Sequence, residues 1–247
     1  MLKNILLPAA LAFLVGCGAC VHAPPPQMGF IRPPAVTTQV RSVEQRSKTY
    51  SHDGPNGKIA IIEFTSGIDE ESANEFLANM ASVPSDALEI VVLLDSPGGY
   101  VHSTRSMIRA VESARVPVVC LVDGIAASGA MLFLQSCDIR VMTHRSSLMI
   151  HNASYQRPEG RSDQESLEEE LHSIRTTNDQ IAWQYCHRLQ MTYDRCRESY
   201  RDHDWWMTEN EALGIQAADM AVTNLAELLS VLDEATTKNS QKAVYSR

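Results

Sequence analysis

Ser128 and His151 are the residues of this sequence whose types and surroundings best suit nucleophilic catalysis. Ser128 stands in the segment Asp123-Gly-Ile-Ala-Ala-Ser-Gly, where an apolar run that predicts a buried strand gives way to one that predicts a short helix. A serine at a strand-to-helix turn presents its hydroxyl to a substrate, and the helix N-terminus helps to stabilise an oxyanion. His151 ends the apolar run Leu148-Met-Ile, where its imidazole can serve as the general base.

Both residues, and a third segment, also have purely structural interpretations. Serine is a common helix N-cap, and a lone histidine is more often a surface or satisfied core residue than a base. The segment Ser96-Pro-Gly-Gly99 offers backbone amides for an oxyanion, but it also suits a tight turn before a helix. His144, the closest competitor of His151, stands in a turn-like polar stretch. No cysteine or histidine cluster in the body has zinc spacing, so we expect neither a metal nor another cofactor.

The elements that would position these residues alternate between strands and helices. Apolar and β-branched runs predict strands, and apolar residues at helical spacing predict helices. The predicted strands are 58–64, 90–94, 117–122, 139–142, 148–151 and 220–223. The predicted helices are 69–81, 101–114, 126–135, 163–188, 193–200, 208–213 and 225–235. This order predicts an α/β fold with right-handed crossovers, followed by a helix-rich C-terminal region.

The order of the motifs along the chain resembles that of the proteolytic subunit of the Clp protease and its phage and bacterial relatives. Three segments match the core motifs of that family in sequence order: Asp95-Ser-Pro-Gly-Gly99, Ala127-Ser-Gly-Ala130 and Met149-Ile-His151. The resemblance continues into Trp206-Met-Thr-Glu-Asn-Glu-Ala-Leu-Gly and ends at Ala218-Asp219. It implies the spiral of βα units that this family shares with the crotonases.

The resemblance also implies the roles of individual residues. It makes Ser128 the nucleophile and His151 the general base, and it assigns the oxyanion hole to the backbone amides of Gly98 and Gly129. Relatives of the same fold that use a lysine base lack the Met-Ile-His motif, which favours a Ser–His pair here.

The acidic member of the triad is the least defined by sequence. The family places an aspartate before the aromatic residue that precedes a (Leu/Met)-(Ser/Thr) pair, after a loop of variable length. An ungapped match to the longer loop puts Tyr200 at this position, and a match to the shorter loop selects Asp202. Because a phenol cannot replace a carboxylate beside an imidazolium, we expect Asp202, with Asp204 and Asp194 as alternatives.

The substrate implied by the family is a peptide or an unfolded polypeptide, cleaved within a homo-oligomeric ring. The chain departs from the family pattern after the histidine, where the family's proline is absent and Asn152-Ala-Ser-Tyr stands instead. Gln156-Arg-Pro-Glu-Gly160 replaces the glycine-rich segment that lines the substrate groove. Two other hypotheses therefore stay open: a hydrolase of the same fold that acts on non-peptide acyl substrates, and a non-catalytic member that binds peptides or partners.

The N-terminal residues have the pattern of an export signal. Residues 1–16 carry one early lysine and an apolar run, and they end in Leu14-Val15-Gly16-Cys17, which is typical of a lipobox. This predicts a lipoprotein anchored to a membrane at Cys17 and facing the periplasm. An ordinary signal peptide cut near Ala23, giving a soluble periplasmic or secreted protein, is the alternative. Residues 17–55 are proline-rich and predict a tether, 56–235 the folded domain, and 236–247 a polar tail.

The composition supports a globular domain and excludes one class of partner. Apolar residues make up 44% of the chain, charged residues 21%, and the formal net charge is -9. Because phosphate binding needs clustered Lys and Arg, this balance argues against nucleic acid as a partner. An exported chain meets an oxidising compartment. We expect a disulfide between Cys186 and Cys196, and Cys120 and Cys137 as buried free thiols, although connectivity stays open.

Overall fold

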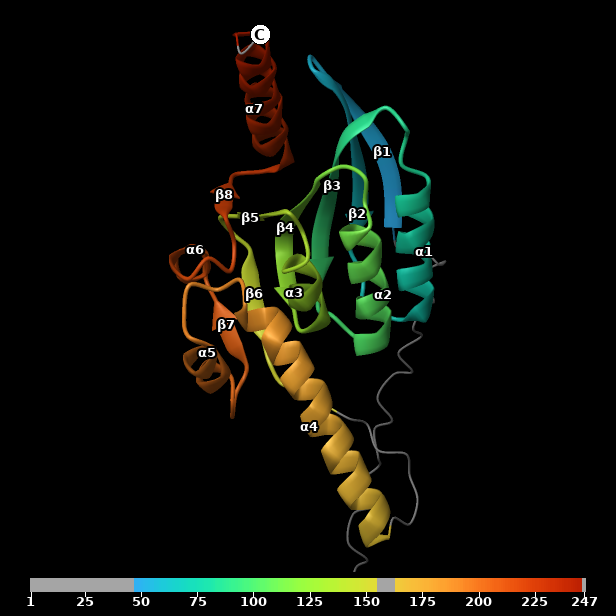
Figure 1. Ribbon diagram of the computed structural model, residues 1–247, viewed down its shortest axis with the longest axis vertical. Helices are drawn as coiled ribbons and strands as arrows, with labels where there is room; N and C mark the ends of the chain where they lie inside the picture. The colour runs from blue at the N-terminus through green and yellow to red at the C-terminus, as the bar shows by residue number, and fades with distance from the viewer. Residues whose placement is uncertain (1–46, 155–162, 246–247) are drawn as a thin grey trace, which may run out of the picture. The chain divides into compact units, whose positions relative to one another are not determined.

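The computed structural model describes residues 47–154 and 163–245, and its centre is one mixed sheet (Figure 1). The main path of the sheet runs β1-β2-β3-β4-β5-β8. These strands are β1 (Ser47–Gly54), β2 (Gly57–Phe64), β3 (Ala87–Ser96), β4 (Val118–Ala127), β5 (Ile139–Thr143) and β8 (Met220–Val222). The hairpin of β1 and β2 is antiparallel, and each later neighbour along this path is parallel. Parallel neighbours need crossover connections, which the helices supply.

The sheet divides at β4, and this division brings distant residues together. The first half of β4 pairs with β5, whereas Ile125–Ala127 pair in parallel with Ser147–Met149 of β6 (Ser147–Ile150). Strand β6 also pairs in antiparallel fashion with β7 (Trp205–Met207). Because β4 and β6 run side by side in the same direction, the residues that follow them, Ser128 and His151, leave the sheet next to each other.

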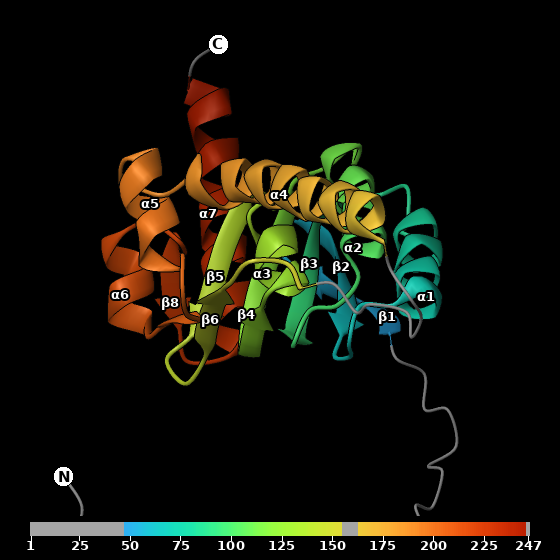
Figure 2. The ribbon, with the colours of Figure 1, turned by 90° about the horizontal axis from the view of Figure 1, so that it is seen from below.

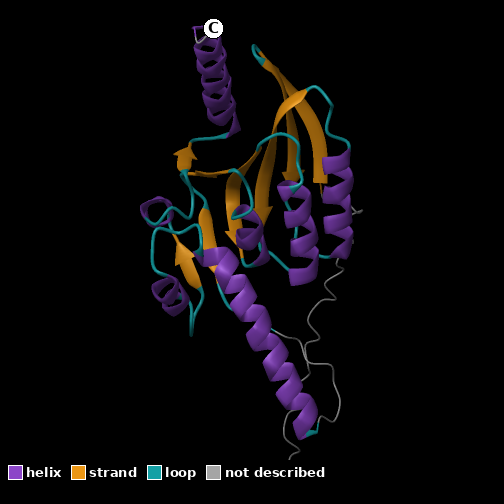
Figure 3. Cartoon of the chain, viewed as in Figure 1, coloured by secondary structure: helices purple, strands orange, loops and turns teal. Residues whose placement is uncertain are grey.

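Seven helices complete the described part of the chain (Figure 3). They are α1 (Glu70–Ala81), α2 (Val101–Glu112), α3 (Gly129–Leu134), α4 (Gln164–Cys186), α5 (Tyr193–Ser199), α6 (Glu209–Gly214) and α7 (Leu225–Tyr245). Viewed along the sheet, α1, α2 and α3 lie on one face, and α4 crosses over them (Figure 2). The side chain of Asp69 caps α1 by accepting a hydrogen bond from the amide of Ser72, as expected for an N-cap aspartate.

The central strands are apolar on both faces because both faces of the sheet are covered. Along β2, Ala60, Ile62 and Phe64 belong to the larger core beneath the helices, while Ile59 and Ile61 belong to a smaller core on the opposite face. The smaller core also contains Leu228 and Leu232 of α7. Continuous apolar runs are typical of parallel strands buried on both sides. The α/β class expected from the sequence is confirmed.

The boundaries of the folded region differ from the predicted ones at both ends. The sheet begins at Ser47, inside the stretch assigned to the tether. Strand β1 was not predicted because it is a polar edge strand without an apolar run. Helix α7 continues to Tyr245, through most of the predicted polar tail. Strand β7 was not predicted, because its three residues form a strand through their pairing with the distant β6. The expected signal, Cys17 and Gln156–Gly160 lie outside the described residues. No helix in the described ranges is long and apolar enough to span a bilayer.

Two disulfides join buried cysteines. The predicted Cys186–Cys196 disulfide is present and links the last residue of α4 to α5. Cys120 and Cys137 also form a disulfide, so the expectation of free thiols was wrong. Cys120 lies within β4 and Cys137 just after α3, so only the packing of α3 onto the sheet brings their Cα atoms to 5.9 Å.

Candidate active site

Ser128 occupies the sharp turn between β4 and α3. Its backbone has φ 55° and ψ -122°, a conformation that non-glycine residues rarely adopt and that costs about 1–3 kcal/mol. The turn is held by the amide of Ser128, which donates to the carbonyl of Met149 at 3.0 Å. Strain of this kind persists where the surroundings fix it, and here it exposes the hydroxyl, as expected for a nucleophile elbow.

Gly98 lies against this turn so closely that no side chain fits. Its φ is +85°, and a Cβ atom there would lie 2.4 Å from the carbonyl oxygen of Ala127 and 2.6 Å from the amide nitrogen of Gly129. These contacts are with backbone atoms, which cannot move aside cheaply. The glycine therefore keeps open the space in front of the Gly129 amide.

His151 contacts Ser128 directly. The distance between His151 Nε2 and Ser128 Oγ is 2.7 Å, a hydrogen bond of normal length. On the other side of the ring, His151 Nδ1 lies 3.4 Å from Oδ1 of Asp204. A proton on Nδ1 leaves Nε2 free to accept the proton of the serine hydroxyl, so the geometry suits a general base.

The acid beside His151 is Asp204, and the preferred candidate Asp202 is therefore replaced by the first alternative. Asp204 immediately precedes β7, whose Trp205 pairs with Ile150, the neighbour of His151. Strand pairing thus carries the Asp204 carboxylate to the imidazole. In the described part of the chain, neither Asp202 nor Asp194 forms an ion pair with His151.

Tyr200, the other candidate from the alignment, has a structural role. It is buried at the end of α5, and its ring packs edge-to-face on that of Tyr185, with centroids 6.1 Å apart. Burial raises the pKa of the Tyr200 phenol to about 12, so it stays neutral.

The amides near Ser128 give a different oxyanion pair from the predicted one. The Gly98 amide is engaged, because it donates to Ser96 Oγ at 3.1 Å. Within the described residues, the Gly99 amide donates no hydrogen bond, and a Cβ atom on Gly129 would lie 3.3 Å from its nitrogen. The geometry therefore supports Gly99 in place of Gly98, beside Gly129, as an available donor.

A cavity of about 720 Å³ opens over Ser128 and His151. Its lining is mostly apolar, and the apolar members are Pro97, Val101, Leu132, Met149, Ala153, Ile181 and Tyr185. His102 and the exposed ring of Tyr100 stack at its rim, with centroids 5.7 Å apart. Among the described residues, the lining contains no carboxylate and no lysine or arginine. Such a cavity suits an apolar side chain or acyl group beside the nucleophile.

Two residues that sequence analysis did not select also contact the site. The Tyr185 hydroxyl donates to the carbonyl of Ser128 at 2.9 Å, and burial raises the pKa of that phenol. Asn152 donates from Nδ2 to the carbonyl of Arg201 at 3.0 Å. These contacts join residues that are 57 and 49 positions apart in sequence, so no local pattern could reveal them.

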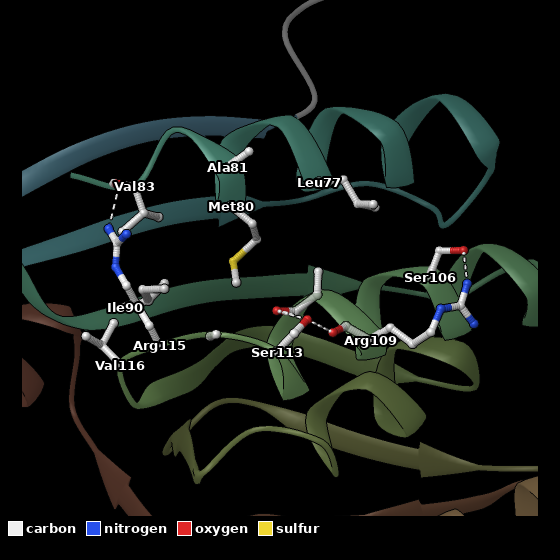
Figure 4. A pocket seen from close by; sticks show the side chains of 12 residues that line it. Leu77, Met80, Ala81, Val83, Ile90, Ser106, Arg109, Ser113, Arg115 and Val116 are labelled. Carbon is white, nitrogen blue, oxygen red and sulfur yellow. Dashed lines mark hydrogen bonds between the residues drawn. The ribbon is translucent and has the colours of Figure 1, made fainter. Parts of the chain in front are cut away.

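A second pocket, of about 600 Å³, lies between α1 and α2 and does not contain a comparable pair (Figure 4). Its two hydroxyls are occupied: Ser113 donates to the carbonyl of Arg109, and Ser106 accepts from the Arg109 guanidinium at 2.9 Å. None of the described residues that line it is a histidine. His144, the competing histidine, contacts Glu209 at 2.8 Å instead of a serine. In the described ranges, no cluster of three or more His, Cys, Asp or Glu residues could hold a metal ion.

Comparison with known proteins identifies a family and a fold to which this chain is similar. The family model described as Clp protease matches residues 49–223. An ATP-dependent Clp protease proteolytic subunit from Pleurastrum terricola is 28% identical over 158 residues, which are 62% of this chain and 78% of the relative. The structure of a ClpP1 mutant from Listeria monocytogenes has a TM-score of 0.59 at 18% identity, and the match covers 67% of this chain and 92% of that one.

A serine next to a histidine at the strand ends of this α/β fold defines a class of hydrolases. The family match, which extends over most of the chain, specifies the class further: the chain belongs to the Clp protease family, a family of serine peptidases. The likeness to the Listeria structure confirms the fold, including the ClpP-like arrangement of βα units expected from the sequence.

Proposed function

We propose that this protein is a serine endopeptidase that cleaves peptides or unfolded polypeptides through Ser128, His151 and Asp204. The observation that carries the proposal is the 2.7 Å contact between His151 Nε2 and Ser128 Oγ at a strained turn. An N-cap serine or a satisfied core histidine would not need this pairing. The family supplies the reaction class, and the apolar cavity suits a peptide side chain next to the cleaved bond.

The reaction would proceed through an acyl-enzyme. Ser128 Oγ attacks the substrate carbonyl carbon while its proton moves to His151 Nε2, and the carbonyl oxygen becomes an oxyanion facing the amides of Gly99 and Gly129. The tetrahedral intermediate collapses, the C–N bond breaks, and the amine leaves with the proton from His151. Water then attacks the ester with His151 again as base, which releases the acid and restores Ser128. Asp204 stabilises the imidazolium in both halves.

The proposal includes the setting in which the enzyme works. A lipid anchor at Cys17 and a periplasmic location would place the domain where ATP is absent, so we propose activity without an ATPase partner. Two disulfides in the described domain agree with an oxidising compartment. Fractionation of cells that express the chain with and without Cys17→Ala would test the anchor. We further propose a homo-oligomeric ring, as implied by the family.

The direct test is covalent labelling of the full chain with a fluorophosphonate, which reacts only with an activated serine. We expect labelling of the wild-type protein without added nucleotide, and its loss in Ser128→Ala and His151→Ala. Turnover of a fluorogenic peptide with an apolar residue before the cleaved bond, compared with an ester of the same acyl group, then separates a peptidase from a general acyl hydrolase.

Matched controls come from residues of the same types outside this cavity. Ser113 donates to the carbonyl of Arg109, and His144 contacts Glu209. Ser113→Ala and His144→Ala should both be labelled like the wild type. A well-folded wild-type protein that does not react would contradict the proposal and favour a binding role.

A further inference from the structure

The Cys186–Cys196 disulfide lies behind the triad, between two helices that each contact it. Cys186 is the last residue of α4, and Cys196 lies in α5. Both residues are buried, at 3% and 0% exposed. Arg197 of α5 also donates to the carbonyl of Asn178 and pairs with the exposed Asp179, and Tyr200 after α5 packs on Tyr185 of α4. Because exposed ion pairs contribute little and ring packing is not covalent, the disulfide is the link that most restricts movement of α5 relative to α4.

Helix α4, which carries Cys186, contacts the backbone of the nucleophile Ser128. Tyr185 directly precedes Cys186, and its buried hydroxyl donates to the carbonyl of Ser128 at 2.9 Å. That carbonyl belongs to the residue whose backbone is strained. The last turn of α4 therefore stabilises the backbone conformation that exposes Ser128 Oγ.

The segment that follows α5, which carries Cys196, contacts the neighbour of the base His151 and leads to the acid Asp204. Tyr200 directly follows α5, and its carbonyl and that of Arg201 accept from Asn152 Nδ2 at 3.4 and 3.0 Å. Asn152 is the neighbour of His151, and Asp204 follows Arg201 by three residues. The amide of Ala153 in turn donates to Asn178 of α4 at 2.7 Å. The end of α5 thus fixes where the chain that carries Asp204 starts, relative to His151.

We infer that the Cys186–Cys196 disulfide positions the triad, so that full hydrolytic activity requires this bond; the inference rests on the proposed function. Within the triad, the contact most sensitive to displacement is the one between His151 and Asp204. Their 3.4 Å separation is already longer than a normal hydrogen bond, and the Asp204 side chain is 56% exposed, so little packing holds it. A small displacement of α5 removes the contact, and misplacement of about 1 Å can cost roughly 100-fold in rate.

The test replaces both cysteines by alanine, because the disulfide is buried and a reducing agent in solution would not reach it readily. In the full chain, Cys186→Ala/Cys196→Ala should lower the acylation rate at saturating fluorophosphonate by roughly 10- to 100-fold. The concentration for half-saturation should change little, since the cavity wall remains. Asn152→Ala, which leaves the disulfide intact, should lower the same rate constant. In an Asp204→Asn background, removal of the disulfide should have a much smaller additional effect, because the contact it supports is already lost.

The other disulfide provides the control. Cys120→Ala/Cys137→Ala removes a buried disulfide that contacts no member of the triad, so it should lower the thermal stability but leave the acylation rate unchanged. Circular dichroism would verify that each variant is folded at the assay temperature. A folded Cys186→Ala/Cys196→Ala protein that acylates at the wild-type rate would overturn the inference while leaving the proposed function intact. If wild-type protein is not labelled, both fail.

Discussion

At the scale of single residues, the site depends on backbone conformations that few residue types allow. Ser128 has a positive φ, and Gly98 lies against it with no room for a Cβ atom. The two form one unit, because the strained serine turn can expose its hydroxyl and the Gly129 amide only if nothing projects from position 98. The carboxylate is less constrained, and this is where sequence and structure differ.

Replacing each candidate aspartate by asparagine tests which of them is the acid of the triad. Asp204→Asn keeps the size of the side chain but cannot stabilise an imidazolium, so kcat for a peptide substrate should fall by up to about 10⁴-fold. Asp202→Asn and Asp194→Asn are matched controls and should stay within about twofold of the wild type. A large loss in Asp202→Asn with little change in Asp204→Asn would reverse the assignment.

At the scale of elements, an irregularity in β4 makes the site possible. Gly124 has φ +132°, and the next amide, of Ile125, donates to Asp95 Oδ1 at 2.9 Å. Ser146 accepts from the Gly124 amide at 3.1 Å and donates to the carbonyl of Val122 at 2.8 Å. These bonds satisfy the backbone where β4 changes partner from β5 to β6, and so they direct the strand end that carries Ser128 toward β6.

The contact between β3 and α7 gives a prediction of pH-dependent stability. Partial burial, with a contribution from the nearby Asp233 carboxylate, raises the pKa of Glu89 above its usual value of 4.5, and the buried Glu89 Oε2 has no hydrogen-bond partner. A raised carboxyl pKa favours the folded state below pH 4.5, and this advantage is lost as the pH rises through the folded-state pKa. Glu89→Gln should therefore increase the free energy of unfolding at pH 7 by up to about 1 kcal/mol, since solvent screens the half-buried group.

Urea unfolding at pH 7 and at pH 4 measures this effect. The difference between Glu89→Gln and the wild type should shrink at the lower pH, where Glu89 is mostly protonated in both the folded and the unfolded state. Glu112→Gln, which makes the same change in net charge at an exposed position on α2, should change little at either pH. A destabilised Glu89→Gln at pH 7 would show that the carboxylate has a favourable partner.

At the scale of the whole molecule, the ring proposed above would need a contact surface, and α4 is a candidate for it. Helix α4 extends well beyond the sheet (Figure 1). Its side chains Leu167, Leu171 and Trp183 are exposed. Exposed apolar side chains on a projecting helix are typical of an association surface. Sedimentation velocity of the full chain should show a species several times the 27.3 kDa of one chain. Ser128→Ala should assemble equally well, and a stable monomer at micromolar concentration would contradict the ring.

The sequence by itself determined the features that depend on local pattern. Apolar runs and helical spacing located most strands and helices, and the motifs around Ser128 and His151 selected the pair that the structure brings to 2.7 Å. Both residues follow apolar strands at fixed positions, so a short window of sequence contains most of the information.

Tertiary structure alone decided the features that depend on contacts between distant segments. The pairing of Ile150 with Trp205 selected Asp204 over Asp202, because strand register, not spacing along the loop, sets which carboxylate reaches the imidazole. The packing of α3 joined Cys120 to Cys137, and the turn at Ser96 occupied the Gly98 amide. Strand β1 could not be predicted from the sequence for the same reason, because a polar edge strand forms only through its pairing with β2.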